Sequence, residues 1–179
     1  MLNLLDWEAT VIIRSRNPQT VGDSLAGNPL VQKALQTGRA QSGTVFIPSD
    51  ELPNEGEDIV NRCRRSGGEP AAMLMGAAVP IFLNNKCTAV VLAGVLLNGD
   101  VKEVDKIRDL IFEGKLYKAK PVGTATIFMK DLRISTNVTD NRGSRAIGTR
   151  VSTEVAEQVL KRGLSWTGRA RVVDEWYIA

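Results

Sequence analysis

The chain has 179 residues, with 23 Lys and Arg against 20 Asp and Glu, and a formal net charge of only +3. This near balance, without a basic block, argues against a nucleic-acid-binding surface. The chain has no histidine, which excludes Ser-His-Asp and Cys-His catalysis as well as His-ligated zinc. No Gly-rich phosphate loop precedes a helix, so no nucleotide cofactor is expected.

The cysteines and the apolar segments narrow the class of protein further. Cys63 and Cys87 are 24 residues apart, a spacing that fits no zinc motif and favours two free or buried thiols over a disulfide. The longest apolar run, Ala89 to Leu97, is too short to span a bilayer. No signal peptide is visible at the start.

The first part of the chain predicts short strands around one helix. Residues Trp7 to Ser15 are rich in β-branched side chains and predict a strand. After a polar loop, Asn28 is a predicted N-cap and Pro29 a first helical residue, and Gly38 is predicted to end that helix. Residues 42–48 predict a second strand. The polar stretch 49–70 has no clear pattern, although part of it suits a short helix.

The middle of the chain predicts a β-hairpin followed by a helix. Two apolar runs, 71–83 and 88–97, are joined by the turn-forming residues 84–86. Val101 to Phe112 has apolar residues at helical spacing.

The pattern of strand, loop, short helix and glycine then restarts. Strands are predicted over 124–128, 132–138, 166–173 and 176–179, and a helix capped by Ser152 or Thr153 over 152–161, ended by Gly163. At an offset of 125 residues, six positions of the segment 30–43 match, among them Gly38 with Gly163. We therefore expect a duplicated α+β unit, whose second sheet lacks the counterpart of the long hairpin.

Five segments near the end of the chain carry a resemblance to a known family: ATIF (125–128), LRISTNV (132–138), AIGTRVS (146–152), TGRA (167–170) and EWYI (175–178). With these segments, residues 123–179 closely resemble the membrane-distal sensor modules of bacterial chemoreceptors and sensor histidine kinases, of the single Cache type. Upstream, residues 16–44 and 93–98 resemble the preceding unit of receptors with two fused Cache units.

The resemblance implies an α+β fold with two PAS-like antiparallel sheets, flanking short helices and a connector helix. We expect a first Cache-like unit over 1–98, the connector helix over 99–122 and a second unit over 123–179. The long N-terminal helix and the final strand pair of such receptors are not found. We therefore expect an excised periplasmic or extracellular piece of an inner-membrane protein, which forms a homodimer in the full-length receptor.

The resemblance also implies a ligand site on the polar face of strand 132–138. Alternation places Leu132 and Ile134 on one face and Arg133, Ser135 and Asn137 on the other. An arginine fork in a water-poor pocket suits a small carboxylate. Arg150 is a weaker candidate, since a lone arginine is more often a surface charge. Trp176 is assigned to the core. The predicted ligand-binding residues are Arg133, Ser135, Thr126, Trp166, Arg169 and Tyr177.

We expect a ligand-sensing domain rather than an enzyme, with a small organic acid as its partner and neither cofactor nor metal. Two alternatives remain. A ligand-free structural or protein-interaction domain would have a closed apolar seam under residues 139–163 in place of a pocket. An enzyme would need a paired nucleophile and base, and scattered carboxylates do not exclude a glycosidase-like pair.

Overall fold

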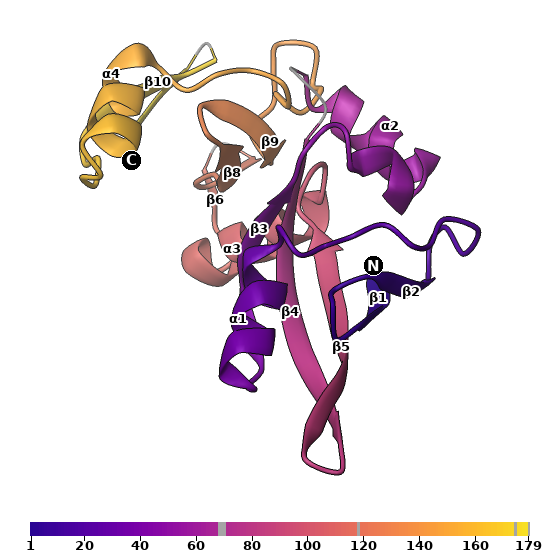
Figure 1. Cartoon of the computed structure of the whole chain (residues 1–179). Coiled ribbons are helices and arrows are strands. Elements are labelled where there is room, and N and C mark those ends of the chain that lie inside the picture. The colour runs from indigo at the N-terminus through magenta and orange to yellow at the C-terminus, as the bar shows by residue number, and fades with distance from the viewer. Residues whose placement is uncertain (68–70, 118, 174, 179) are drawn as a thin grey trace. The chain divides into compact units, whose positions relative to one another are not determined.

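The computed structural model describes residues 1–67, 71–117, 119–173 and 175–178, and it divides into two compact units (Figure 1). Unit 1 comprises Met1–Cys63 and Glu69–Leu97, and unit 2 comprises Arg64–Gly68 and Asn98–Ala179. The fold is mixed α+β with one large antiparallel sheet, as predicted and as in PAS-like Cache domains. The kinship of the two units as tandem Cache domains stays a prediction.

Unit 1 is built on a five-stranded antiparallel sheet with the strand order β2-β1-β5-β4-β3. The predicted hairpin is its longest part. Its two turn residues, Asn84 and Asn85, have φ values of 50° and 63°, the left-handed conformation that suits the twist of a tight hairpin. The strands are β1 (Leu2–Asp6), β2 (Val11–Arg14), β3 (Gln41–Ile47), β4 (Ala72–Leu83) and β5 (Lys86–Leu96).

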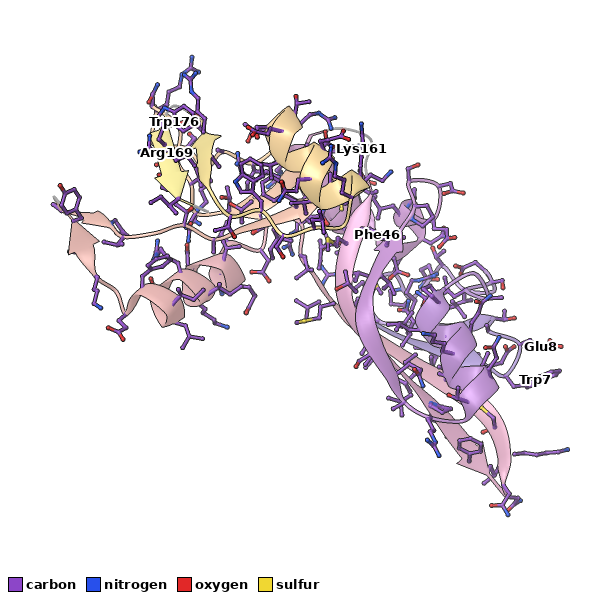
Figure 2. The ribbon with its side chains drawn as sticks, turned by 90° about the vertical axis from the view of Figure 1, so that its left-hand side faces the viewer. Trp7, Glu8, Phe46, Lys161, Arg169 and Trp176 are labelled. Carbon is purple, nitrogen blue, oxygen red and sulfur yellow. The ribbon has the colours of Figure 1, made fainter. Side chains whose placement is uncertain are left out.

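The strand predicted over Trp7 to Ser15 is confirmed only for Val11–Arg14, because the chain turns before it. The Asp6 carboxylate accepts hydrogen bonds from the backbone N–H groups of Glu8 and Thr10, at 2.9 and 2.8 Å. A short acidic side chain that binds the backbone ahead of it favours a turn over a continued strand. Trp7 and Glu8 therefore lie at an exposed turn between β1 and β2 (Figure 2).

The first helix has the boundaries that its capping residues predict. In α1 (Pro29–Thr37), Asn28 Oδ1 accepts from the backbone N–H groups of Leu30 and Val31, at 3.0 and 3.3 Å. Gly38 follows in the left-handed conformation, with φ of 63°. Leu30, Val31 and Ala34 are buried and belong with residues of the sheet to one hydrophobic core cluster.

The polar stretch without a clear sequence pattern forms two short helices, which lie in unit 1 as far as Cys63. A 3-10 turn, η1, covers Leu52–Glu55, and α2 covers Glu57–Arg65. Ile59, Val60 and Cys63 are buried from α2. The core of unit 1 thus also draws on a segment that has no clear sequence pattern.

Unit 2 has one longer helix and three separate strand pairs. The α3 helix has the bounds that the apolar spacing predicts and belongs to unit 2. The connector helix expected over residues 99–122 is too long, because the helix ends at Phe112 and the strands β6 and β7 follow it. Ser135 and Asn137 of the strand region donate to the carbonyls of Asp100 and Val104 at this helix. Ser152 caps α4, which continues as a π-helical turn over Glu157–Lys161. The remaining bounds are α3 (Val101–Phe112), β6 (Leu116–Tyr117), β7 (Lys120–Pro121), β8 (Thr126–Met129), β9 (Leu132–Thr136), α4 (Thr153–Ala156), β10 (Arg169–Val172) and β11 (Glu175–Ile178).

In unit 1, a loop returns to pair with β2 through three backbone hydrogen bonds. Val11 N–H donates to Asp23 O, Gly22 N–H donates to Val11 O, and Leu25 N–H donates to Ala9 O, each at 2.9 Å. Gly22 has a φ of 88°, which favours glycine at this bend.

Unit 2 repeats this ladder between β9 and its own return loop. Arg133 N–H donates to Thr149 O at 2.8 Å, Gly148 N–H to Arg133 O at 2.9 Å, and Val151 N–H to Asp131 O at 2.9 Å. Gly148 has a φ of 86°. In both units the three hydrogen bonds follow the same order along the strand and along the return loop. This supports a duplicated hairpin-and-loop element, in which Arg133 occupies the place of Val11.

The two cysteines are free thiols in different environments. We expect a thiol reagent to modify native Cys87, which is half-buried, far faster than Cys63. Cys63 is 1% exposed, and burial raises its pKa to about 11, so that roughly one thiol in a thousand is ionised at pH 8.

Reaction with Ellman's reagent, before and after denaturation, measures this difference. The Cys87→Ser variant should lose the fast phase and keep the slow one. Equal rates for both thiols in the native protein would contradict the packing of α2 described above.

Candidate functional site

A cavity of about 610 Å³ lies within unit 2, in the size range of small-molecule pockets. Its walls come from β8 and β9, from the return loop over residues 149–152 and from the region of β10. The lining residues are Thr124, Thr126, Phe128, Arg133, Thr149, Arg150, Val151, Ser152, Val155, Trp166, Ala170, Arg171, Val172 and Val173.

A β-bulge decides which side chains of β9 face this cavity. Phe128 pairs with Arg133 and Ile127 pairs with Ser135, which leaves Ile134 as the extra residue. A bulge shifts the alternation of faces by one residue. Arg133 therefore shares its face with Thr136 rather than with Ser135.

The bulge corrects the predicted polar face of this strand. Ser135 is fully buried, and its hydroxyl donates to the carbonyl of Asp100 at 2.6 Å. Asn137 donates to the carbonyl of Val104 at 3.2 Å. Both side chains thus bind the region of α3, and neither lines the cavity with Arg133.

Arg133 lies in the cavity wall as a buried cation without a carboxylate partner among the described residues. It is 4% exposed, and its Nη1 atom donates to the hydroxyl of Thr149. Its guanidinium carbon lies 5.2 Å from the ring centre of Phe128, within the range of a cation–π contact. Its Nε–H has no hydrogen-bond partner in the part of the chain that the structure describes. Burial lowers the pKa of Arg133, as expected when a charge loses water without gaining a counter-ion.

Trp166 contributes a second buried donor to the same cavity. Its indole Nε1–H has no hydrogen-bond partner among the described residues, and Trp166 lines the cavity together with Arg133. Buried donors are nearly always satisfied by protein, water or ligand. Among the described residues the cavity therefore presents one buried cation, that of Arg133, and two unused N–H donors, an arrangement that suits an anion with several acceptor atoms.

The structure separates the other predicted site residues. Thr126 lines the same cavity, and its hydroxyl is 2.7 Å from that of Thr136. Arg169 is exposed and does not line it. Tyr177 instead lines a second cavity of unit 2, of about 700 Å³, together with Arg145.

The structure also places Trp176 and Arg150, which the sequence predicts as a core residue and as a weaker ligand contact. Trp176 is 69% exposed, so its assignment to the core is wrong. It lies in the two-stranded β10–β11 sheet, close to Arg169 in Figure 2, and no further described strand pairs with that sheet. Arg150 lines the cavity but is already bound to Asp131 at 2.6 Å.

Sequence reasoning missed Phe128 and Thr149, the two side chains in contact with Arg133. The duplicated element contains a signal for both. Thr149 of unit 2 accepts the same backbone hydrogen bond as Asp23 of unit 1. Phe128 pairs with Arg133 across its hairpin in the way that Leu5 pairs with Val11.

Residues 95–179 match the family model of single Cache domain 3. The match includes every residue that lines the cavity of unit 2, and it supports a Cache domain in this part of the chain. A search of the curated proteins finds no match.

The described residues contain no group of three His, Cys, Asp or Glu side chains able to hold a metal ion, and none of their helices is long and apolar enough to cross a membrane.

We expect Arg133→Met to raise the free energy of unfolding of the ligand-free protein by about 1 kcal/mol, because it removes a buried, unpaired charge and keeps most of the volume. Urea denaturation measures the change. The matched control is Arg145→Met, which breaks a bidentate pair with Asp105 at 2.9 and 2.7 Å and should lower that free energy by about 1–2 kcal/mol. A loss at Arg133 as large as at Arg145 would show that Arg133 has a partner in the fold.

Proposed function

We propose that the chain is an extracytoplasmic ligand-sensing domain of a bacterial transmembrane signalling receptor, a chemoreceptor or a histidine kinase, and that unit 2 binds a small carboxylate. The Cache match over residues 95–179 supports the sensing role, because Cache domains are small-molecule sensors of signalling receptors rather than catalytic domains. The observation that carries the ligand class is Arg133, a cation that lines a cavity without a carboxylate partner among the described residues.

The chemistry of the cavity supports an anion of planar shape. A guanidinium donates two parallel hydrogen bonds to a carboxylate, and these charge-assisted bonds are strongest where water is excluded. Thr126 and Thr149 add hydroxyl groups to the wall, and the Trp166 indole adds a second type of donor. Val151, Val155 and Val172 supply apolar surface for the carbon skeleton.

The cavity wall also offers a route for the signal. Val155 belongs to α4, and Ala170, Arg171 and Val172 belong to β10, which pairs with β11. A ligand that contacts these elements would favour one of their arrangements over another. We propose that the parent receptor is membrane-anchored and homodimeric, and that this bias passes to its output domain.

A ligand-free structural domain is the competing function. It predicts a closed apolar seam beneath residues 139–163, whereas a cavity with an unpaired cation is found beside residues 149–155. The cavity favours the sensing function, because a buried charge without a partner destabilises the fold and contributes nothing to a purely structural role.

Isothermal titration calorimetry of the whole chain with two- to four-carbon carboxylates tests the proposal. We expect at least one acid to bind, and Arg133→Ala to weaken it about tenfold or more, since a hydrogen bond to a charged group contributes roughly 1.5–3 kcal/mol. The fold should persist, which circular dichroism checks.

Arg169→Ala is the matched control, because it removes the same charge from an exposed position that does not line the cavity. It should leave the affinity nearly unchanged. The proposal fails if no acid binds, or if both variants weaken binding equally.

A further inference from the structure

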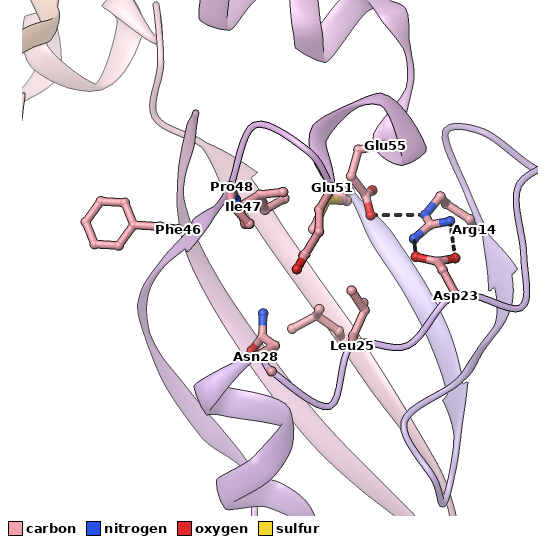
Figure 3. A pocket seen from close by; sticks show the side chains of 12 residues that line it. Arg14, Asp23, Leu25, Asn28, Phe46, Ile47, Pro48, Glu51 and Glu55 are labelled. Carbon is pink, nitrogen blue, oxygen red and sulfur yellow. Dashed lines mark hydrogen bonds and ion pairs between the residues drawn. The ribbon is translucent and has the colours of Figure 1, made fainter. Parts of the chain in front are cut away.

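A second, smaller cavity of about 140 Å³ lies within unit 1. Figure 3 shows the side chains that line it, which come from β2, the loop before α1, the end of β3 and the η1 region. It is too small for a drug-sized ligand but has room for several water molecules or for one small organic ion. It shares no lining residue with the cavity of unit 2.

Negative charge exceeds positive charge in the wall of this cavity. The lining residues include three carboxylates, Asp23, Glu51 and Glu55, and two cationic groups, the guanidinium of Arg14 and the α-ammonium of Met1, which donates to a backbone carbonyl. Arg14 is already committed, because it binds both Asp23 oxygens at 2.9 and 2.7 Å and the Oε1 atom of Glu55 at 3.0 Å. Burial alone lowers the pKa of Arg14, but its hydrogen bonds and ion pairs with these carboxylates outweigh burial, and the pKa of Arg14 is raised. The same contact with Arg14 lowers the pKa of Asp23.

Two carboxylate groups retain unused acceptors. Glu55 is 2% exposed, and its Oε2 atom has no hydrogen-bond partner within the described ranges of the chain. Glu51 makes no side-chain hydrogen bond or ion pair among the described residues, and Figure 3 shows its carboxylate pointing into the space between Asn28 and Leu25. Burial and the neighbouring carboxylates of Asp50, Asp23 and Glu55 raise the pKa of Glu51. The cavity thus holds uncompensated negative charge, which a cation would neutralise.

The form of the site favours an organic cation over a metal ion. The described residues contain no group of three side chains in metal-ligating geometry, and hard divalent cations require several oxygen ligands at once. An ammonium group needs only a few acceptors, to each of which it donates an N–H. Leu25, Ile47 and Leu92 supply apolar wall for a short alkyl chain.

We propose that the cavity of unit 1 binds a small primary ammonium ion, which donates hydrogen bonds to Glu51 and to the free oxygen of Glu55. The site is separate from the anion site of unit 2, and it neither requires nor excludes a ligand there. The charge of Arg14 stays paired with Asp23 and Glu55 and holds Glu55 in place.

Calorimetry and thermal denaturation of the whole chain with methylammonium, ethylammonium and propylammonium chloride test this proposal. We expect at least one of them to bind and to raise the melting temperature. Tetramethylammonium, which lacks an N–H donor, and sodium chloride at the same ionic strength should have no such effect.

Glu51→Gln is the decisive variant, because it keeps the size of the side chain and breaks no hydrogen bond among the described residues. It should weaken ammonium binding about tenfold or more. Glu8→Gln, which makes the same charge change at an exposed position outside the cavity (Figure 2), should bind as the unchanged protein does. Arg133→Ala should also leave ammonium binding intact, which separates this proposal from the anion site.

Three results would each overturn the proposal. The first is that no primary ammonium ion binds to the folded protein. The second is equal affinity of the unchanged protein and Glu51→Gln. The third is an equal stabilisation by tetramethylammonium or sodium ions, which would identify a general salt effect.

Discussion

The arrangement of unit 2 depends on one uncompensated charge, the buried guanidinium of Arg133. A charge out of water is costly unless it is paired, and among the described residues Arg133 has only the Thr149 hydroxyl and the Phe128 ring. The bulge at Ile134 turns Arg133 toward the cavity and turns Ser135 toward α3. The fold thus binds Ser135 and Asn137 of one face to backbone carbonyls and leaves a buried donor group on the other face unused among the described residues.

The comparison with unit 1 isolates what distinguishes the position of Arg133 from its equivalent there. The backbone ladder and the bulge occur in both units, so the hairpin and its return loop supply only the scaffold. In unit 1 the equivalent pair is Leu5 and Val11, 0% and 2% exposed in the core. In unit 2 the pair is Phe128 and Arg133. A change of side chain on one backbone therefore converts a core position into a candidate binding position.

The sequence predicts well what local chemistry determines. Asn28 and Gly38 bound α1, and the pair Asn84 and Asn85 turns the hairpin, because each acts on its own backbone within a few residues. The bulge at Ile134 escapes prediction, since simple alternation contains no signal for an extra residue in a strand. The choice of Arg133 rests on the Cache resemblance together with the chemistry of its side chain. Its neighbour Thr149 depends on a loop that returns to β9, and such non-local pairing is not visible in a local pattern.

The distribution of apolar burial adds a thermodynamic consequence for sensing. The described hydrophobic core cluster lies entirely in unit 1, from Leu5 to Leu96. In unit 2 the deeply buried apolar side chains are fewer, with Val104, Ile134 and Val138 among them. A ligand that binds only the folded form stabilises it in proportion to its concentration relative to Kd. Unit 2 has less buried apolar surface among its described residues, and Arg133 has no carboxylate partner among them. If the proposed anion binds there, its contribution would therefore form a larger share of the stability of that unit. Occupancy of the cavity can then change the order of its walls, which is the property that a sensor requires.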